Sequence, residues 1–437
     1  MDASQFLESL TNIPQIDYMH SRRHVDPIFF LKRTKWLIKK LPDLTQFLLN
    51  ANFVHITGTS GKGTVGAILQ NILACAGYKT GFYNSPHVVE VYERMRIADG
   101  RDEALPHFYT ISPQTFDSLT QFLKPYLEKS IINSPYGLPS YFEILLTIAL
   151  LYFKEEGCKW IVLEAGCGGR YDAVNVVPQN NLTVITNIGY DHEHLIGPKL
   201  SDIAYEKAGL IKKGSKVLVG PKIKGKILQV IKKEAKQKKS TLIAFSKIEI
   251  RKLEHASSAV RRGGGIRNWE INKIIAYKAA QILNIHSDAV NRGIKQYAPL
   301  PGRFEIIKKE PLIIFDGAHN PDKIKYLISQ YPISNIQYQQ KFLIFGSVDT
   351  KNWRAMLKLL IPYFDKIYLT RHNVLHRKSA DLKKMYNYVV KRCKFRGQAK
   401  IFIDPADALK TATTKAKKKD FILATGSLYL IGNLKKL

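Results

Sequence analysis

The chain has 437 residues, of which 45% are hydrophobic, so it is long enough for two or three domains with packed cores. It has no run of eighteen apolar residues, and its four cysteines form no CxxC pair, so we expect neither a membrane span nor a zinc or disulfide framework. The N-terminal stretch lacks the basic and apolar regions of a secretory signal. Together these features predict a cytoplasmic protein.

The chain is strongly basic, with 67 Lys and Arg against 36 Asp and Glu and a formal net charge of +31. The lysines are spread along the chain, mostly as pairs and triplets such as Lys212-Lys213. A solvated lysine-rich surface is the simplest interpretation. A positive field that attracts polyanions such as ATP comes second, and specific nucleic-acid binding comes third. We therefore expect no nucleic-acid partner.

In chain order, the first fifty residues favour helices, and the first clear strand covers 53–57. A glycine-rich turn follows at once, and apolar residues at helical spacing then predict a helix from 65 to Gly77. The remaining expected elements of this half are strands at 80–84, 160–164, 182–186 and 217–219, and a helix at 141–155. Strands that alternate with helices predict a parallel sheet covered on both faces.

A proline-rich segment at 299–302 reads as a linker, and the alternation restarts beyond it. We expect strands at 312–315, 342–345, 367–369, 401–403 and 421–424. The predicted organisation is an ATP-binding domain over 1–299 and a smaller Rossmann-like domain over 300–437. The glycine patch at 262–265 reads as a flexible turn.

The turn after the first strand has the composition of a phosphate loop. In a strand–loop–helix unit, backbone N–H groups and the helix N-terminus face an anion. Lys62 would reach the terminal phosphates, and the Thr64 hydroxyl would bind magnesium. The spacing differs from GxxxxGK[ST], and a chance glycine-rich turn is the alternative. The candidate ATP-binding residues of the loop are Gly58, Thr59, Ser60, Gly61, Lys62, Gly63 and Thr64.

The loop pattern GTxGKG[ST] resembles that of folylpolyglutamate and dihydrofolate synthases, a branch of the Mur ligase superfamily. Further segments resemble family motifs in the same order: Asn84–His87, Glu93–Ile97, Tyr141–Glu143, Leu163–Asn175, Asn187–His192, Glu206–Lys212, Leu300–Glu305, Phe315–Pro321 and Gly426–Leu430. The resemblance implies an α/β fold with a Mur-ligase-like central P-loop ATPase domain, whose sheet is parallel-rich, and a smaller Rossmann-like C-terminal α/β domain.

The resemblance implies an ATP-dependent ligase that joins L-glutamate to a folate or dihydropteroate carboxylate through an acyl phosphate and releases ADP and phosphate. Which acceptor is used, and how many glutamates are added in which linkage, stays open. The alternative is another amino-acid ligase of the superfamily. The extra loop glycine, the SPH motif and the short stretch before residue 58 oppose a cell-wall ligase with a UDP-sugar domain.

The resemblance also implies ATP as co-substrate, two Mg²⁺ sites, potassium dependence and a monomer. Its magnesium ligands match Thr64, Ser85, Glu143 and His192. Lys207 matches a lysine that is carbamylated in many relatives and then helps to hold a second magnesium. The alternatives are a helix-start carboxylate for Glu143, a structural histidine for His192 and an ordinary lysine for Lys207.

Other matched positions concern the nucleotide and the acceptor. Lys62, His192, Lys207 and His319 are the candidate catalytic residues, although His319 also fits a helix-capping turn. Arg303 would neutralise phosphate charge, Asp316 would orient the ribose or the hinge, and Asn272, preferred over Asn268, would contact adenine. Gly168, Arg170, Asp172 and Asn175 would line the pterin side, with a tight turn as the alternative. We expect the second domain to close over ATP and exclude water.

Overall fold

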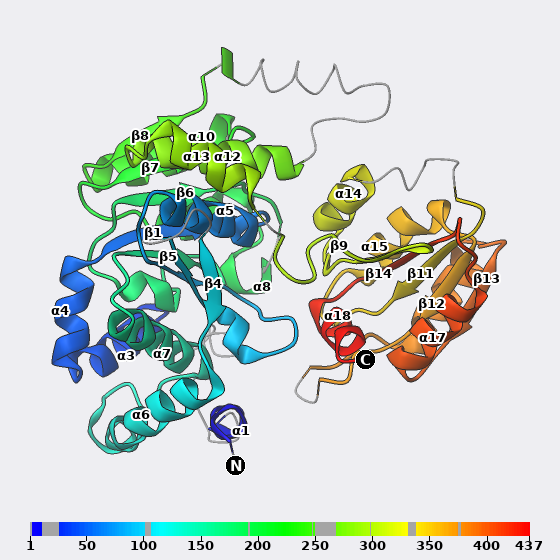
Figure 1. Ribbon diagram of the computed structural model, residues 1–437, viewed down its shortest axis with the longest axis horizontal. Coiled ribbons are helices and arrows are strands. Elements are labelled where there is room, and N and C mark those ends of the chain that lie inside the picture. Colours follow the sequence, from blue (N-terminus) through cyan, green and yellow to red (C-terminus); the bar gives the residue numbers. More distant parts are fainter. Residues whose placement is uncertain are drawn as a thin grey trace. The chain divides into compact units, whose positions relative to one another are not determined.

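The computed structural model describes residues 2–10, 26–100, 106–190, 193–246, 248–249, 268–297, 299–330, 338–374 and 377–437. The chain forms two compact units (Figure 1). Most described residues up to Tyr297 belong to the N-terminal unit. The C-terminal unit contains the residues from 299 onward together with His87–Glu90. The division at 299/300 stays a prediction.

The described part of the N-terminal unit contains an eight-stranded sheet in the order β4-β3-β2-β5-β1-β6-β7-β8. The strands are β1 Asn52–Thr57, β2 Thr80–Tyr83, β3 Met95–Asp99, β4 His107–Thr110, β5 Trp160–Glu164, β6 Leu182–Ile185, β7 Lys216–Val219 and β8 Thr241–Ala244. In this spatial order, the neighbours from β2 through β5, β1, β6 and β7 to β8 pair in parallel. At the other edge, β3 pairs antiparallel with β2, and β4 pairs antiparallel with β3. The four neighbours β2, β5, β1 and β6 therefore end at the same edge of the sheet.

Helices cover both faces of this sheet. They are α1 Ala3–Ser9, α3 Ile28–Lys39, α4 Pro42–Asn50, α5 Lys62–Cys75, α6 Pro113–Asn133, α7 Tyr141–Glu155, α8 Glu193–Ile196, α9 Leu200–Ala208, α10 Gly225–Gln237, α12 Asn268–Ile282 and α13 Ser287–Lys295, with 3₁₀ turns η2 Val91–Arg94 and η3 Ala173–Val176. Among the described helices, none is both long and apolar enough to cross a membrane.

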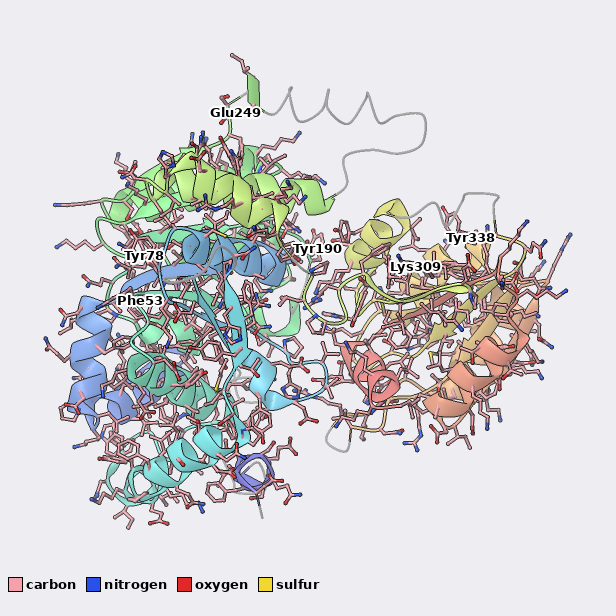
Figure 2. All side chains as sticks on the ribbon, in the orientation of Figure 1. Phe53, Tyr78, Tyr190, Glu249, Lys309 and Tyr338 are labelled. Atoms are coloured by element: carbon pink, nitrogen blue, oxygen red, sulfur yellow. The ribbon has the colours of Figure 1, made fainter. Side chains whose placement is uncertain are left out.

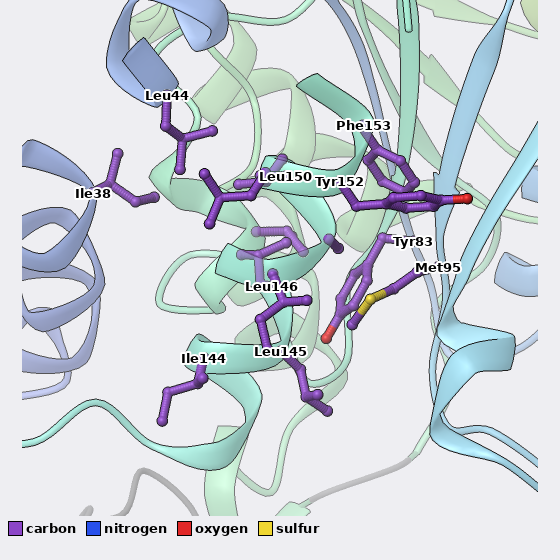
Figure 3. Close-up of a cluster of buried hydrophobic side chains, with 14 of the residues drawn as sticks. Ile38, Leu44, Tyr83, Met95, Ile144, Leu145, Leu146, Leu150, Tyr152 and Phe153 are labelled. Carbon is purple, nitrogen blue, oxygen red and sulfur yellow. The ribbon is translucent and has the colours of Figure 1, made fainter. Parts of the chain in front are cut away.

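The two faces of the sheet bury alternate residues of the same strands. Tyr83 of β2 joins the cluster formed by α3, α4, α6 and α7 (Figure 3), whereas Phe82 lies against Gly66 of α5. Helix α7 is apolar on nearly all sides and is buried almost throughout, as expected for a helix enclosed by other elements. These layers hold the carboxyl ends of the central strands in fixed positions.

The described part of the C-terminal unit contains a six-stranded sheet in the order β13-β12-β11-β14-β10-β9. The strands are β9 Glu305–Lys309, β10 Leu312–Phe315, β11 Lys341–Phe345, β12 Lys366–Leu369, β13 Gln398–Ile401 and β14 Phe421–Thr425. The helices are α14 Pro321–Gln330, α15 Trp353–Leu360, α16 Leu382–Asn387, α17 Pro405–Lys415 and α18 Leu428–Lys435, with short turns η4 Ile361–Tyr363 and η5 Tyr388–Arg392. Successive residues of β10, β11 and β14 enter two separate cores, so both faces are buried.

The structure confirms the predicted α/β class and most of the predicted strands. The predicted parallel-rich sheet is confirmed, and antiparallel pairing is confined to the edge strands β3, β4 and β9. Strand β13 ends at Ile401, where a strand at 401–403 was expected. Strands β3, β4, β8 and β9 were missed. The glycine patch at 262–265 lies outside the described residues.

Candidate active site

The phosphate loop connects β1 to α5, and two of its glycines are required by close packing. Gly58 and Gly61 both have positive φ, at 148° and 80°. A Cβ on Gly58 would lie 1.9 Å from Thr186 Oγ1, and one on Gly61 would lie 2.4 Å from Asn272 Oδ1. The loop is therefore enclosed by the end of β6 and by α12. This places Asn272, which is 9% exposed, against the loop. Its adenine contact stays a prediction.

Residues after β6 hold the first half of the loop in place. Asn187 Oδ1 accepts hydrogen bonds from the backbone N–H groups of Thr59, at 3.0 Å, and Ser60, at 2.9 Å. Thr186 Oγ1 donates to the Ser60 carbonyl at 2.7 Å. Because the Thr59 and Ser60 N–H groups are used in this way, we expect the N–H groups of the first turn of α5, from Lys62 to Thr64, to face an anion. Asn187 belongs to the family motif Asn187–His192, but no role was predicted for it from the sequence.

Two lysine amines meet at one carbonyl of the loop. Lys62 Nζ lies 3.2 Å from the Gly58 oxygen, and Lys207 Nζ, from α9, lies 3.0 Å from the same oxygen. Lys207 is 5% exposed. Two amines at a helix N-terminus form a positive site that suits phosphate oxygens. The carbamylation of Lys207 stays a prediction.

Glu164 is a site residue that sequence reasoning missed. It is the last residue of β5 and is 3% exposed. Its Oε1 lies 3.8 Å from Lys62 Nζ, and its Oε2 accepts a hydrogen bond from the Ser85 backbone N–H at 3.4 Å. A buried carboxylate at the end of a strand beside the phosphate loop was the signal that could have found it, since Glu164 pairs with Ile56 in the parallel register.

The loop after β5 carries Asp172 toward the same edge. Asp172 caps η3, accepting from Cys167 N at 2.9 Å and Val174 N at 3.0 Å. Burial raises the pKa of Asp172, although these N–H groups and the charge of Lys62 act against the rise. A Cβ on Gly166 would lie 3.6 Å from both Asp172 Oδ2 and Ser85 Oγ, so these two oxygens flank one point beside Glu164.

The other three predicted pterin-side residues tie this loop to itself and to neighbouring segments, namely α9, the residue that follows it and α10. Gly168 has a φ of 68°, and a Cβ there would lie 3.3 Å from Glu206 Oε2. Asn175 Nδ2 donates to the carbonyls of Arg170, at 2.7 Å, and Gly209, at 3.3 Å. Arg170 donates to Glu234 Oε2 at 2.8 Å. These contacts are those of a tight, cross-linked turn, and a pterin contact stays a prediction.

Glu143 makes the contacts expected of the helix-start alternative. It is 4% exposed, and it accepts from Arg33 Nε at 2.7 Å and Arg33 Nη2 at 3.1 Å. It also accepts from the Ser140 backbone N–H at 2.8 Å and forms a capping box at the start of α7. Burial raises the pKa of its carboxyl group against the effect of Arg33. A magnesium role for Glu143 stays a prediction, and it would have to disrupt this ion pair.

His192 lies outside the described residues. The chain before it is described as far as Tyr190, which Figure 2 labels. Tyr190 is 53% exposed. In the described ranges, no three His, Cys, Asp or Glu side chains gather as a metal-binding group. Thr64, Ser85 and Glu164 offer two hydroxyls and one carboxylate. Such oxygen donors fit Mg²⁺, which usually takes one or two carboxylates and completes its shell with water and phosphate oxygens.

The predicted residues of the C-terminal unit form two linked turns. Asp316 accepts from the backbone N–H groups of Phe304 and Ala318, each at 2.8 Å, and burial raises its pKa. It therefore joins the turn that carries Arg303 to the turn that carries His319. His319 Nδ1 lies 2.8 Å from the Gly317 carbonyl. Its Nε2 lies 2.9 Å from Lys323 Nζ, a partner that sequence reasoning missed. The roles of Arg303, Asp316 and His319 toward ATP stay predictions.

Comparison with known proteins agrees with this geometry. A family model described as Mur ligase, glutamate ligase domain, matches residues 302–428. The dihydrofolate synthase/folylpolyglutamate synthase of Buchnera aphidicola subsp. Baizongia pistaciae is 30% identical over 416 residues, covering 93% of this chain and 90% of that protein. The Bacillus subtilis protein of the same name is 28% identical over 404 residues, covering 87% and 89%.

A solved structure adds a likeness in three dimensions. It is the bifunctional folylpolyglutamate synthase/dihydrofolate synthase from Yersinia pestis, complexed with AMPPNP and a Mn ion. This chain is 25% identical to it with a TM-score of 0.76, and the match covers 100% of this chain and 98% of that one.

Fold, phosphate loop and relatives together define an ATP-dependent acid–amino-acid ligase of the Mur ligase type. Within that class, the chain belongs to the dihydrofolate synthase/folylpolyglutamate synthase family. The predicted family, fold and enzyme class are confirmed.

Proposed function

We propose that this enzyme uses ATP and magnesium to activate a carboxylate of dihydropteroate or of a folate, and then joins L-glutamate to it. The carboxylate oxygen attacks the γ-phosphorus, and the bond from that phosphorus to ADP breaks. The glutamate amine next attacks the acyl carbon, phosphate leaves, and the amine loses a proton. The observation that carries the proposal is the gathering of Lys62, Lys207, Glu164 and Ser85 around one phosphate loop.

The residues of the N-terminal unit have distinct parts in this reaction. The first-turn N–H groups of α5 and the amine of Lys62 bind the terminal phosphates and neutralise the charge that moves during transfer. Thr64, Ser85 and Glu164 would hold Mg²⁺, which supplies charge neutralisation of the phosphates when bound. Asp172, which lies close to Ser85 beside Gly166, would face the acceptor.

Both acceptors are proposed as substrates. The Buchnera and Bacillus relatives carry both activities in their names, as does the Yersinia protein. A bifunctional enzyme is therefore the version of the proposal that the relatives favour. The oxygen donor set, together with the AMPPNP and Mn ion of the Yersinia complex, supports ATP and a divalent metal as requirements.

Several finer features of the family are proposed with it. They are a second magnesium held with the help of a carbamylated Lys207, stimulation by potassium, a monomeric state, a cytoplasmic location and closure of the 300–437 domain over the nucleotide. Omission of bicarbonate and of potassium from the assay, and light scattering of the purified chain, test the first three.

The deciding experiment measures ADP release with Mg²⁺, ATP and L-glutamate, offering dihydropteroate and tetrahydrofolate separately. We expect stimulation by both, and complete loss with EDTA. Stimulation by one acceptor alone would restrict the activity to that acceptor. Silence with both acceptors would contradict the proposal and favour another amino-acid ligase of the superfamily.

A further inference from the structure

The 3₁₀ turn η3, which follows Asp172, is held at both of its ends. At its start, the Asp172 carboxylate accepts from the Val174 N–H at 3.0 Å. At its other end, His55 Nε2 lies 2.9 Å from the Val174 carbonyl, and Lys212 Nζ donates to the Asn175 carbonyl at 2.8 Å. The position of Asp172 is therefore tied to two side chains that come from other elements, β1 and the segment after α9.

Lys212 is itself firmly fixed. Its carbonyl accepts from Ser215 Oγ at 2.9 Å and from Ser240 Oγ at 2.7 Å, which fixes the backbone at the base of the side chain. Its amine then reaches one carbonyl of η3, and the Asn175 amide continues the chain of contacts to Arg170 and Gly209. A rigid base and a single acceptor are the features of a side chain that positions a loop.

The surroundings of this amine are unfavourable for its charge. The pKa of Lys212 is lowered to about 7, mainly by burial and also by the cations Lys35, from α3, and Lys238, after α10. Lys212 in turn contributes to the low pKa of His55, which burial lowers most. A charged amine with cationic neighbours destabilises the folded state, because the neutral form is the one that folding favours.

An amine that lies in surroundings unfavourable for its charge and yet donates a hydrogen bond to a site loop points to a function, since an apolar side chain of similar length is expected to fold better. We propose that Lys212 is a positioning residue for the acceptor: by holding the Asn175 carbonyl it fixes η3, and with it the Asp172 carboxylate, at the carboxyl end of β5. The inference rests on the proposed function, because it assigns the loop to the pterin or folate acceptor.

The test compares Lys212→Met with Lys213→Met, whose exposed neighbouring side chain provides the matched control. For Lys212→Met we expect the KM for dihydropteroate to rise about 10-fold, by loss of one charge-assisted hydrogen bond. The KM for ATP should stay within about 2-fold, and Tm at pH 7 should rise by about 2 °C or more. Lys213→Met should change none of these quantities, and Lys212→Arg should restore most of the acceptor affinity.

A pH series gives a second readout. Between pH 7 and 9 the wild-type KM for the acceptor should rise several-fold as Lys212 loses its proton, since the bond from a neutral amine is weaker. The Lys212→Arg enzyme should not show this rise, because arginine stays charged. Of the neighbouring groups, His55 stays neutral over this range, and Lys35 and Lys238 are common to both proteins.

The outcomes are separable. A lowered Tm with both KM values changed would make Lys212 an ordinary structural residue and overturn the proposal. An unchanged acceptor KM in Lys212→Met would overturn it as well. A wild-type enzyme that no acceptor stimulates would instead contradict the proposed function, and this inference with it.

Discussion

At the scale of single residues, Lys62 provides the most direct test of the phosphate loop. Its side chain is 16% exposed, and its amine lies near the Gly58 carbonyl and the Glu164 carboxylate. Lys62→Ala should therefore leave Tm nearly unchanged and lower kcat by about 10³-fold, as expected when charge stabilisation of a transition state is lost. ADP release and thermal unfolding measure the two quantities. Full activity in this variant would mean that the loop does not hold the phosphates.

The two buried glutamates are expected to affect different quantities: Glu164 the activity, and Glu143 the stability of the fold. Glu164→Gln removes the charge beside Lys62 and Ser85, so kcat should fall about 100-fold with little loss of stability. Glu143→Gln breaks the buried pair with Arg33 and should cost about 3 kcal/mol of unfolding free energy, while the folded enzyme keeps most of its kcat. Urea unfolding and ADP release should be measured on both variants. A stable but inactive Glu143→Gln enzyme would instead indicate that Glu143 binds magnesium.

At the scale of elements, His55 links β1 to η3 and makes the stability of the fold depend on pH. Burial lowers its pKa from 6.5 to about 3, so the folded chain binds its proton later than the unfolded chain does. The stabilisation from neutral His55 is complete above pH 6.5 and is lost as pH falls from 6.5 toward 3. Relative to His55→Gln, the wild type should lose about 1.4 kcal/mol per pH unit in that window. Urea unfolding at pH 7, 6 and 5 checks the difference, which would be constant if His55 did not titrate in this way.

Some secondary-structure elements could be predicted from the sequence, and others could not. The run from β1 through α5 to β2 combines a buried apolar strand, a glycine-rich turn and a helical repeat, and all three were expected. Strands β4 and β9 expose most of their residues and carry no continuous apolar run, so the pattern of a buried strand is absent from them. Edge strands of this kind are defined by their neighbours in the sheet more than by their own composition.

Some residues of the candidate site could likewise be predicted from the sequence, and others could not. The family motifs assigned Lys62, Lys207, Ser85 and Asp172 to one candidate site, and the place of Ser85 after a parallel strand is where ligands bind in such sheets. The partners of Glu143 and of the loop could not be read from the sequence, since Arg33 lies 110 residues from Glu143 and Asn187 lies 127 from Ser60. Glu164 was not predicted as a site residue, because a carboxylate at the end of a strand does not by itself reveal that the neighbouring strand is β1, which leads into the phosphate loop.

At the scale of the whole molecule, the net charge of +31 should act on ATP capture more than on chemistry. Raising NaCl from about 50 to 300 mM at constant potassium should increase the KM for ATP several-fold and leave kcat nearly unchanged, because salt screens long-range attraction.

Duplex DNA should be retained only weakly and should not change ADP release, since the lysines are dispersed. Replacing Lys226, Lys233 and Lys236 on the exposed side of α10 with glutamine should weaken retention on heparin without lowering kcat. DNA-stimulated ADP release with a steep salt dependence would instead identify a nucleic-acid-dependent ATPase.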